Sequence, residues 1–356
     1  MLIKLTIASS LIATAFSTPL DSTCFAHRDG KAVPLNLPKD AFTGAIEAAS
    51  VNKAGDVFAA GFVRGNQSEP GLSFGFFNQV KDGVKNVLSD DNPVFIVNND
   101  TGTAPILAGA RFVQDGNKVL LADASNHRVL SVNVTTEKAS IFCSDPKMLQ
   151  PNDIAISAVR KCLIYLSGQN YTANTVAGES GDLWTCNGGK ATQFRSEILK
   201  KADIHRTNGI EVSPDGSFLY LTSAKNIENK VRDHKIFKFA LDRSTGALLE
   251  KDPVLFYEFK GLGISSDLDG MRTDIDGNLY ATLNGEGKVV KLSPEGKVLQ
   301  TILTTGVKGP SNVELGGKDG RILFAIGKCE DNVEVGCAAS FHADKPGRAF
   351  MELNRT

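Results

Sequence analysis

A short pattern of a polar turn followed by an apolar run recurs along the chain, and it constrains the fold more than any other feature. Each copy leads from a turn, usually with Gly, into β-branched or aromatic residues that end at a small or polar side chain. Asp-Gly before alternating apolar residues predicts a hairpin. The copies are KAGDVFAAG from Lys53, QDGNKVLLAD from Gln114, VRKCLIYLSG from Val159, PDGSFLYLTS from Pro214, IDGNLYATLN from Ile275 and KDGRILFAIG from Lys318.

These six copies are roughly 40 to 60 residues apart, which is the range of one propeller blade. Further hairpin signals lie between them: HRVLSVNVTTEKASIF from His127, KIFKFALDRSTGALLE from Lys235 and VVKLSPEGKVLQTI from Val289. Long helical periodicity is almost absent, and many short strands indicate a sandwich, a barrel or a propeller. The repeat favours an all-β, six-bladed β-propeller, which we predict as a single domain over residues 18–356.

The N-terminus predicts a secretory signal peptide over residues 1–17. Lys4 supplies a short positive region, an uncharged apolar stretch runs from Leu5 to Phe16, and Ala15 and Ser17 are small residues at the positions that signal peptidase recognises. The apolar stretch is too short to span a membrane. A buried N-terminal strand is the alternative.

Two further patterns suit an exported glycoprotein with disulfide bonds. The sequon Asn-x-Ser/Thr occurs at Asn66, Asn99, Asn133, Asn170 and Asn354. The six cysteines are an even number, as expected for disulfides: Cys24, Cys143, Cys162, Cys186, Cys329 and Cys337. Cys329 and Cys337 are close enough in sequence to close a small loop, and we expect that pair first. The other four allow three pairings.

Oxygen-bearing side chains precede the apolar strand in four of the predicted blades. They are Glu47 in GAIEAASVNKAGDVF, Asn152 in LQPNDIAIS, Asn208 in HRTNGIEVSPDG and Asp269 in SSDLDGMRTDIDG. Residues just before an innermost strand lie at one mouth of a propeller's channel, so the four are predicted to meet on the axis. Two carboxylates and two amide carbonyls form an oxygen-only site for a hard cation. Alternatively, an Asn or Asp at such a position only stabilises its own turn.

Four segments carry a resemblance to a known family: TNGIEVSPDGSFLYLTSA from Thr207, LDGMRTDIDGNLYATLNGEGKVVKLSPEGK from Leu268, GPSNVELGGKDGRILFAI from Gly309 and QPNDIAIS from Gln150. Through them the chain resembles the superfamily of gluconolactonase, regucalcin (senescence marker protein) and luciferin-regenerating enzyme. The resemblance implies a six-bladed propeller with one divalent metal on the axis, and lactonase or related esterase activity. It also implies that Glu47, Asn152, Asn208 and Asp269 ligate the metal and that Asp269 is the base or nucleophile. Where the family often has Glu-Gly-Pro, this chain has Glu47-Ala48-Ala49.

The sequence thus predicts a secreted, metal-dependent hydrolase of a small lactone or ester. Calcium is the favoured cation, with magnesium, manganese or zinc as alternatives. Arg111 and His205 are predicted to bind substrate; for His205 an ordinary loop position facing solvent is the competing interpretation. The net charge of −1 gives no electrostatic reason to expect nucleic acid or a membrane surface as a partner, and we expect a monomer. The competing hypothesis is a secreted propeller that binds a ligand or partner without catalysis and holds a structural metal.

Overall fold

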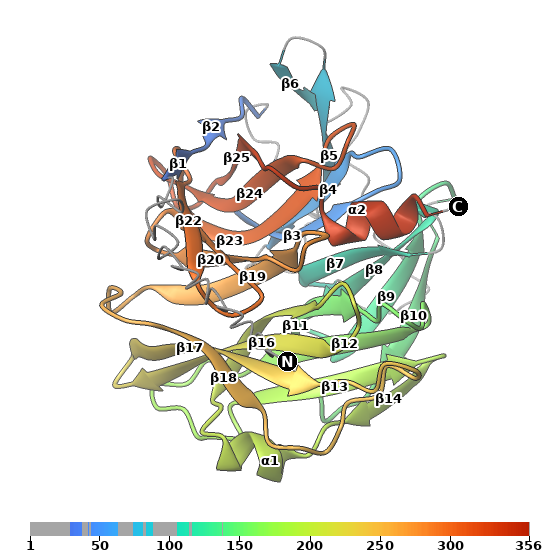
Figure 1. Cartoon of the computed structure of the whole chain (residues 1–356), viewed down its shortest axis with the longest axis vertical. Helices are drawn as coiled ribbons and strands as arrows, with labels where there is room; N and C mark the ends of the chain where they lie inside the picture. The colour runs from blue at the N-terminus through green and yellow to red at the C-terminus, as the bar shows by residue number, and fades with distance from the viewer. Residues whose placement is uncertain are drawn as a thin grey trace, which may run out of the picture.

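A computed structural model describes residues 29–37, 42, 44–62, 74–80, 83–87, 105–113, 116–136 and 138–355, with the backbone alone for 74–80 and 83–87 (Figure 1). The predicted signal peptide, Cys24 and the sequons at Asn66 and Asn99 lie outside these residues.

The described strands form six sheets. Three of them contain β3 (Ala45–Val51), β4 (Val57–Phe62), β5 (Phe74–Val80) and β6 (Gly83–Val87); β7 (Leu107–Val113), β8 (Lys118–Asp123), β9 (Arg128–Asn133) and β10 (Ala139–Ser144); and β11 (Gln150–Ile156), β12 (Leu163–Gln169), β13 (Gly181–Asn187) and β14 (Lys190–Gln193). In each sheet, strands that follow one another in sequence are antiparallel neighbours.

The other three sheets follow the same order. They contain β15 (Arg206–Val212), β16 (Phe218–Ile227), β17 (Lys230–Ala240) and β18 (Val254–Phe259); β19 (Asp267–Thr273), β20 (Leu279–Asn284), β21 (Lys288–Leu292) and β22 (Val298–Leu303); and β23 (Val307–Gly316), β24 (Ile322–Cys329) and β25 (Gly336–His342). Short helices are α1 (Ser196–Lys201) and α2 (Arg348–Leu353).

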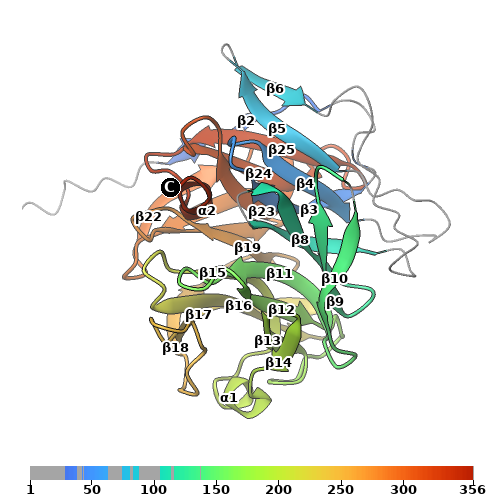
Figure 2. The ribbon, with the colours of Figure 1, turned by 90° about the vertical axis from the view of Figure 1, so that its right-hand side faces the viewer.

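The first strands of the six sheets close into a ring, which makes the protein an all-β propeller as predicted. β3 contacts β7, β7 contacts β11, and the series continues through β15, β19 and β23 back to β3. Two N-terminal strands complete the outer edges: β1 (Gly30–Lys31) pairs with β22, and β2 (Val33–Pro34) pairs with β25. Figure 2 shows the sheets stacked side by side and α2 seen end-on.

The six sequence repeats each supply the second strand of a different sheet: β4, β8, β12, β16, β20 and β24. The hairpins expected from His127 and Val289 are confirmed as β9–β10 and β21–β22. The hairpin expected from Lys235 is present but short: its second strand forms one antiparallel bridge, Leu248 with Leu241, and most of β17 pairs with β18 further along. In the turn of this hairpin, Asp242 Oδ1 accepts backbone N–H groups of Ser244 and Thr245 at 2.9 Å.

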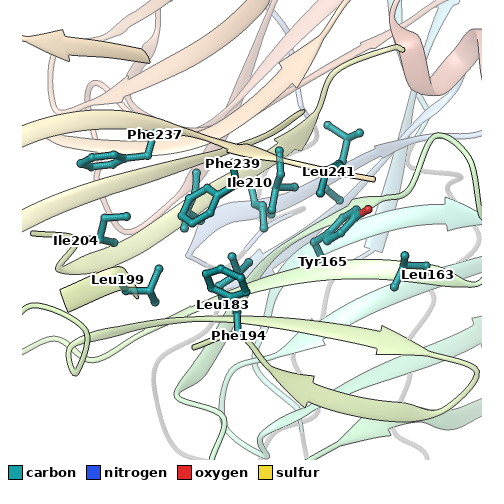
Figure 3. Close-up of a cluster of buried hydrophobic side chains, with 14 residues drawn as sticks. Leu163, Tyr165, Leu183, Phe194, Leu199, Ile204, Ile210, Phe237, Phe239 and Leu241 are labelled. Atoms are coloured by element: carbon teal, nitrogen blue, oxygen red, sulfur yellow. The ribbon is translucent and has the colours of Figure 1, made fainter. Parts of the chain in front are cut away.

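The apolar core lies between neighbouring sheets, since the inner strands are covered on both faces. In β12 every residue is buried. One cluster fills the space between the β11–β14 and β15–β18 sheets, with Leu183, Ile210 and Phe239 close together (Figure 3). The Phe194 and Phe239 rings meet edge to face, with centroids 5.7 Å apart, a geometry that adds to the gain from burial.

Two disulfide bonds are present in the described residues, Cys143–Cys186 and Cys329–Cys337. The second is the predicted short-range pair. The first joins β10 to β13 and so links two adjacent sheets. Cys162 is exposed and forms no disulfide with another cysteine of the described residues, which do not include Cys24. None of the described helices has the length and apolar character needed to cross a membrane.

We expect a Cys143→Ser/Cys186→Ser variant to lose about 2–4 kcal/mol of unfolding free energy, because the bond closes a loop of 43 residues in the unfolded chain. Urea denaturation followed by tryptophan fluorescence measures this loss. The matched control Cys162→Ser removes an exposed thiol and should leave the midpoint unchanged. Equal midpoints for the double variant and the control would contradict the expectation.

Candidate active site

The innermost strand of every sheet contains a β-bulge near its start. Pairing registers shift after Ile46, Leu107, Pro151, Thr207, Leu268 and Pro310. The residues that follow these positions are Glu47, Ala108, Asn152, Asn208, Asp269 and Ser311. A bulge breaks the two-residue alternation of a strand and re-aims a side chain. The four predicted metal ligands therefore share one register, as the sequence pattern indicated, and Ala108 and Ser311 complete the layer.

Hydroxyl groups of one sheet hold the bulge of the next. Ser167 Oγ on β12 donates to the carbonyl oxygen of Asn208. Thr282 Oγ1 on β20 lies 3.4 Å from the carbonyl oxygen of Ser311, and Ser311 Oγ donates to the carbonyl oxygen of Ile46. These buried bonds satisfy carbonyls that the bulges remove from the ladders.

A glycine allows two bulges to approach closely. A Cβ placed on Gly209 would lie 2.0 Å from the carbonyl oxygen of Asp269. Only glycine fits there, so β15 and β19 can bring Asn208 and Asp269 to the same end of the channel.

A cavity of about 540 Å³ opens at this end of the channel. Among the described residues, its lining has both predicted carboxylate ligands, a third carboxylate, an amide, two aromatic rings and one lysine. The lining residues are Gly44, Ala45, Glu47, Phe62, Tyr171, Asp269, Asn284, Lys328, Val333 and Glu334. The last three come from the end of β24 and the loop closed by the Cys329–Cys337 disulfide.

Glu47 and Asp269 line this cavity and interact electrostatically. Burial raises the pKa of Asp269 well above 3.8, and the charge of Glu47 raises it further. Asn284 Nδ2 donates to Asp269 Oδ2 at 2.9 Å and opposes this rise. Carboxylates brought together out of water favour a bound cation or a proton.

The donor set fits a hard divalent cation. Asn208 is 4% exposed, and its side-chain oxygen has no hydrogen-bond partner in the part of the chain that the structure describes. A buried acceptor without a partner lowers stability unless something binds it. Asn152 is half-buried. Within the described residues no group of three or more His, Cys, Asp or Glu side chains could hold a metal, so a cation here depends on the amide oxygens. Glu47, Asn152, Asn208 and Asp269 are the residues that would hold it.

One wall of the cavity was not found from the sequence. Tyr171 lies in the loop after β12, and the Arg206 guanidinium stacks 4.3 Å from its ring centroid. Arg206 Nη2 donates to Asp267 Oδ2 at 2.6 Å, and Tyr171 Oη lies 3.4 Å from the same oxygen. A tyrosine in a loop belongs to no periodic pattern that would mark it as part of a site. The one available signal was Asp267, which contacts Tyr171 and lies two residues before Asp269.

Arg111 lies deeper in the channel and does not line this cavity. It is 2% exposed, and its Nη1 atom is 3.3 Å from Asp153 Oδ1. Arg272 bridges Asp153 Oδ2 at 3.4 Å and Glu314 Oε2 at 3.0 Å. These side chains belong to a buried ion network that also contains Glu211 and Arg348.

His205 is also separate from the cavity. It is 5% exposed, so it does not face solvent as the competing interpretation held. Its Nδ1 lies 3.0 Å from Thr175 Oγ1, and its Nε2 lies 3.0 Å from Asp203 Oδ1. These two contacts fix the ring of His205, which directly precedes β15.

With the fold and the site in place, comparison with known sequences identifies the family. The profile of the SMP-30/Gluconolactonase/LRE-like region matches residues 92–326, more than half of the chain. The protein belongs to this family.

Two relatives are named as lactonases. A 6-deoxy-6-sulfogluconolactonase of Pseudomonas putida is 26% identical over 185 residues, covering 48% of this chain and 59% of that protein. A gluconolactonase of Zymomonas mobilis is 24% identical over 222 residues, covering 61% and 59%. The chain spans less than two thirds of the length of these relatives.

Among solved structures, the calcium-binding protein regucalcin of Agrobacterium tumefaciens superimposes with a TM-score of 0.61. The match covers 91% of this chain and 97% of that one at 17% identity. At this identity the likeness concerns the fold alone.

We expect Asp269→Asn to stabilise the protein in the presence of a chelator. A carboxyl whose folded-state pKa is raised above 3.8 makes folding less favourable as the pH rises toward that folded value. The amide removes this penalty and can still accept a hydrogen bond from Asn284 Nδ2. Thermal unfolding in chelator measures it, with the exposed Asp319→Asn as control. A lower midpoint for Asp269→Asn would contradict the expectation.

We expect Arg348→Met to lower the free energy of unfolding by about 3–5 kcal/mol. The substitution removes the closest ion-pair partner of buried Glu211 and leaves Arg111, whose Nη2 lies 3.7 Å from Glu211 Oε2. Burial raises the pKa of Glu211, but Arg348, Arg111 and Arg272 outweigh it and hold that pKa below 4.5. The ionised group therefore stabilises the fold above pH 4.5, and the stabilisation is lost as the pH falls through the folded value.

Urea midpoints across the acid range check this expectation. In Arg348→Met the loss should begin at higher pH than in the wild type. Arg195→Met removes an exposed arginine paired with Glu250 and should change little. Parallel pH profiles for the wild type and Arg348→Met would refute the role given to this pair.

Proposed function

We propose that the protein is a secreted, metal-dependent hydrolase of a small lactone or ester. The observation that carries the proposal is the bulge layer, which places Glu47 and Asp269 in a solvent-open cavity with the unsatisfied oxygen of Asn208 in the same register. The family and the named lactonases support lactone hydrolysis.

We infer that the site binds one divalent cation, with calcium favoured by its hard oxygen donors. The calcium-binding regucalcin shares the fold, which supports this choice. When bound, a divalent cation supplies positive charge that polarises a carbonyl oxygen and favours deprotonation of a nearby water.

Asp269 is the proposed general base. It lines the cavity, and Asn284 fixes its Oδ2 oxygen, so Oδ1 is left to take a proton. Water gives its proton to Asp269 and its oxygen to the carbonyl carbon, the ring C–O bond breaks, and the proton passes to the leaving alkoxide to give a hydroxy acid. Direct attack by the Asp269 carboxylate is the alternative route.

The walls suit a small, partly polar ring. Phe62 and Tyr171 offer aromatic surface, while Lys328 and Asn284 can donate hydrogen bonds. The two disulfides support export, because such bonds persist in oxidising compartments. We propose no nucleic-acid or membrane partner and a monomeric chain.

Hydrolysis of a panel of sugar and aliphatic lactones by the purified protein tests the proposal. Activity should vanish with a chelator and return with calcium, manganese, magnesium or zinc. Asp269→Asn should lower kcat/KM by about 100-fold or more, while Asp319→Asn should match the wild type. Metal content measured on each variant separates loss of the base from loss of the cation.

Full activity of Asp269→Asn, or activity unaffected by chelation, would overturn this mechanism. Tightly bound metal with no hydrolysis of any lactone or ester would favour the competing hypothesis, a propeller that binds a ligand and holds a structural metal.

A further inference from the structure

A second cavity lies at the other end of the channel. Neighbouring innermost strands run in the same direction, since Phe112 N donates to Ser50 Oγ at 2.8 Å and Thr273 Oγ1 donates to the carbonyl oxygen of Val212 at 3.0 Å. The bulges mark the start of these strands, and their carboxyl ends form the opposite mouth. Helix α2 covers part of this mouth, beside β3 and β7 in Figure 1.

This second cavity has a volume of about 120 Å³. Its walls are mostly apolar and come from the ends of β3, β7 and β11 and from α2. The apolar members are Val51, Phe112, Val113, Ile156, Ala158, Ala349 and Leu353. An apolar cavity of about 150 Å³ in another protein holds benzene. The cavity here is smaller but open at one side, so a single ring can occupy it with one edge at the opening.

Positive charge surrounds the apolar walls. Among the described residues, the cavity is lined by Arg111, Lys161, Arg348 and Arg355 and by one acid, Glu352. Glu352 already forms an ion pair with Arg348, whose Nη1 lies 2.9 Å from Glu352 Oε1. Lys161 and Arg355 are exposed, and neither forms an ion pair within the part of the chain described.

The two buried arginines of the cavity already pair with carboxylates. Arg111 and Arg348 are 2% and 4% exposed. Both lie against Glu211, at 3.7 Å from Arg111 Nη2 and 2.5 Å from Arg348 Nη2. The positive charge left for a ligand is therefore that of Lys161 and Arg355 at the rim, which favours a negatively charged ligand over a neutral or cationic one.

We propose that this second cavity binds a small monocarboxylate whose apolar part is a single ring or a short alkyl chain. The apolar part occupies the space beneath α2, and Lys161 and Arg355 hold the carboxylate at the rim. A polyhydroxylated sugar acid does not suit these walls, because its hydroxyl groups would lose water without gaining partners. The ligand class is therefore distinct from the product expected at the catalytic cavity.

Isothermal titration of the full chain with benzoate tests the proposal, with benzyl alcohol as the neutral ring and acetate as the charge without a ring. We expect one benzoate site, and binding of either control ligand at least about tenfold weaker. Lys161→Ala/Arg355→Ala should weaken benzoate by about tenfold or more, whereas Lys190→Ala/Lys200→Ala, which removes the same charge elsewhere, should not.

Two further variants locate the site. Ala158→Leu fills the cavity and should abolish benzoate binding without unfolding the protein, as thermal unfolding would verify. Asp269→Asn should leave benzoate affinity unchanged. Absence of benzoate binding, equal binding of benzyl alcohol, or unchanged affinity in Lys161→Ala/Arg355→Ala would overturn the proposal, as would loss of binding in Asp269→Asn.

Discussion

One extra residue in each innermost strand is the constraint on which the rest of the site depends. A regular strand would send alternate side chains into the gaps between sheets, where the core is apolar. The bulge interrupts that alternation at the same level in every sheet, so a polar side chain follows Ile46, Pro151, Thr207 and Leu268 without entering the core. Hydroxyls such as Ser167 then tie each bulge to its neighbour.

Below the bulge layer, the channel contains buried arginine, aspartate and glutamate side chains that form ion pairs. Arg272 reaches carboxylates on two other strands and donates to the carbonyl oxygen of Ala49 at 2.7 Å. Such a network helps to specify which strands meet, although buried pairs contribute less stability than their geometry suggests. Asp153 belongs to it and directly follows Asn152, so the network also supports the candidate ligand layer.

The periodic parts of the fold were predictable from the sequence, and the parts set by tertiary contact were not. The turn-and-strand repeat revealed the second strand of every sheet because it is local. The shared register of Glu47, Asn152, Asn208 and Asp269 was visible for the same reason. How deep a side chain lies in the channel depends on contacts between sheets and cannot be predicted from neighbouring residues. For this reason Arg111 was expected at the substrate, whereas it lies in the ion network. Tyr171 and the Cys143–Cys186 bond depend on sheets meeting in space.

The N-terminal strands have a consequence for the order of synthesis. β2 is among the first described residues to be made, yet its partner β25 is among the last. The sheet that contains both β2 and β25 is therefore incomplete until nearly the whole chain has been made. The earlier sheets must form before this sheet closes the ring. Closure of the ring therefore belongs to the last stage of folding, once β25 has been made.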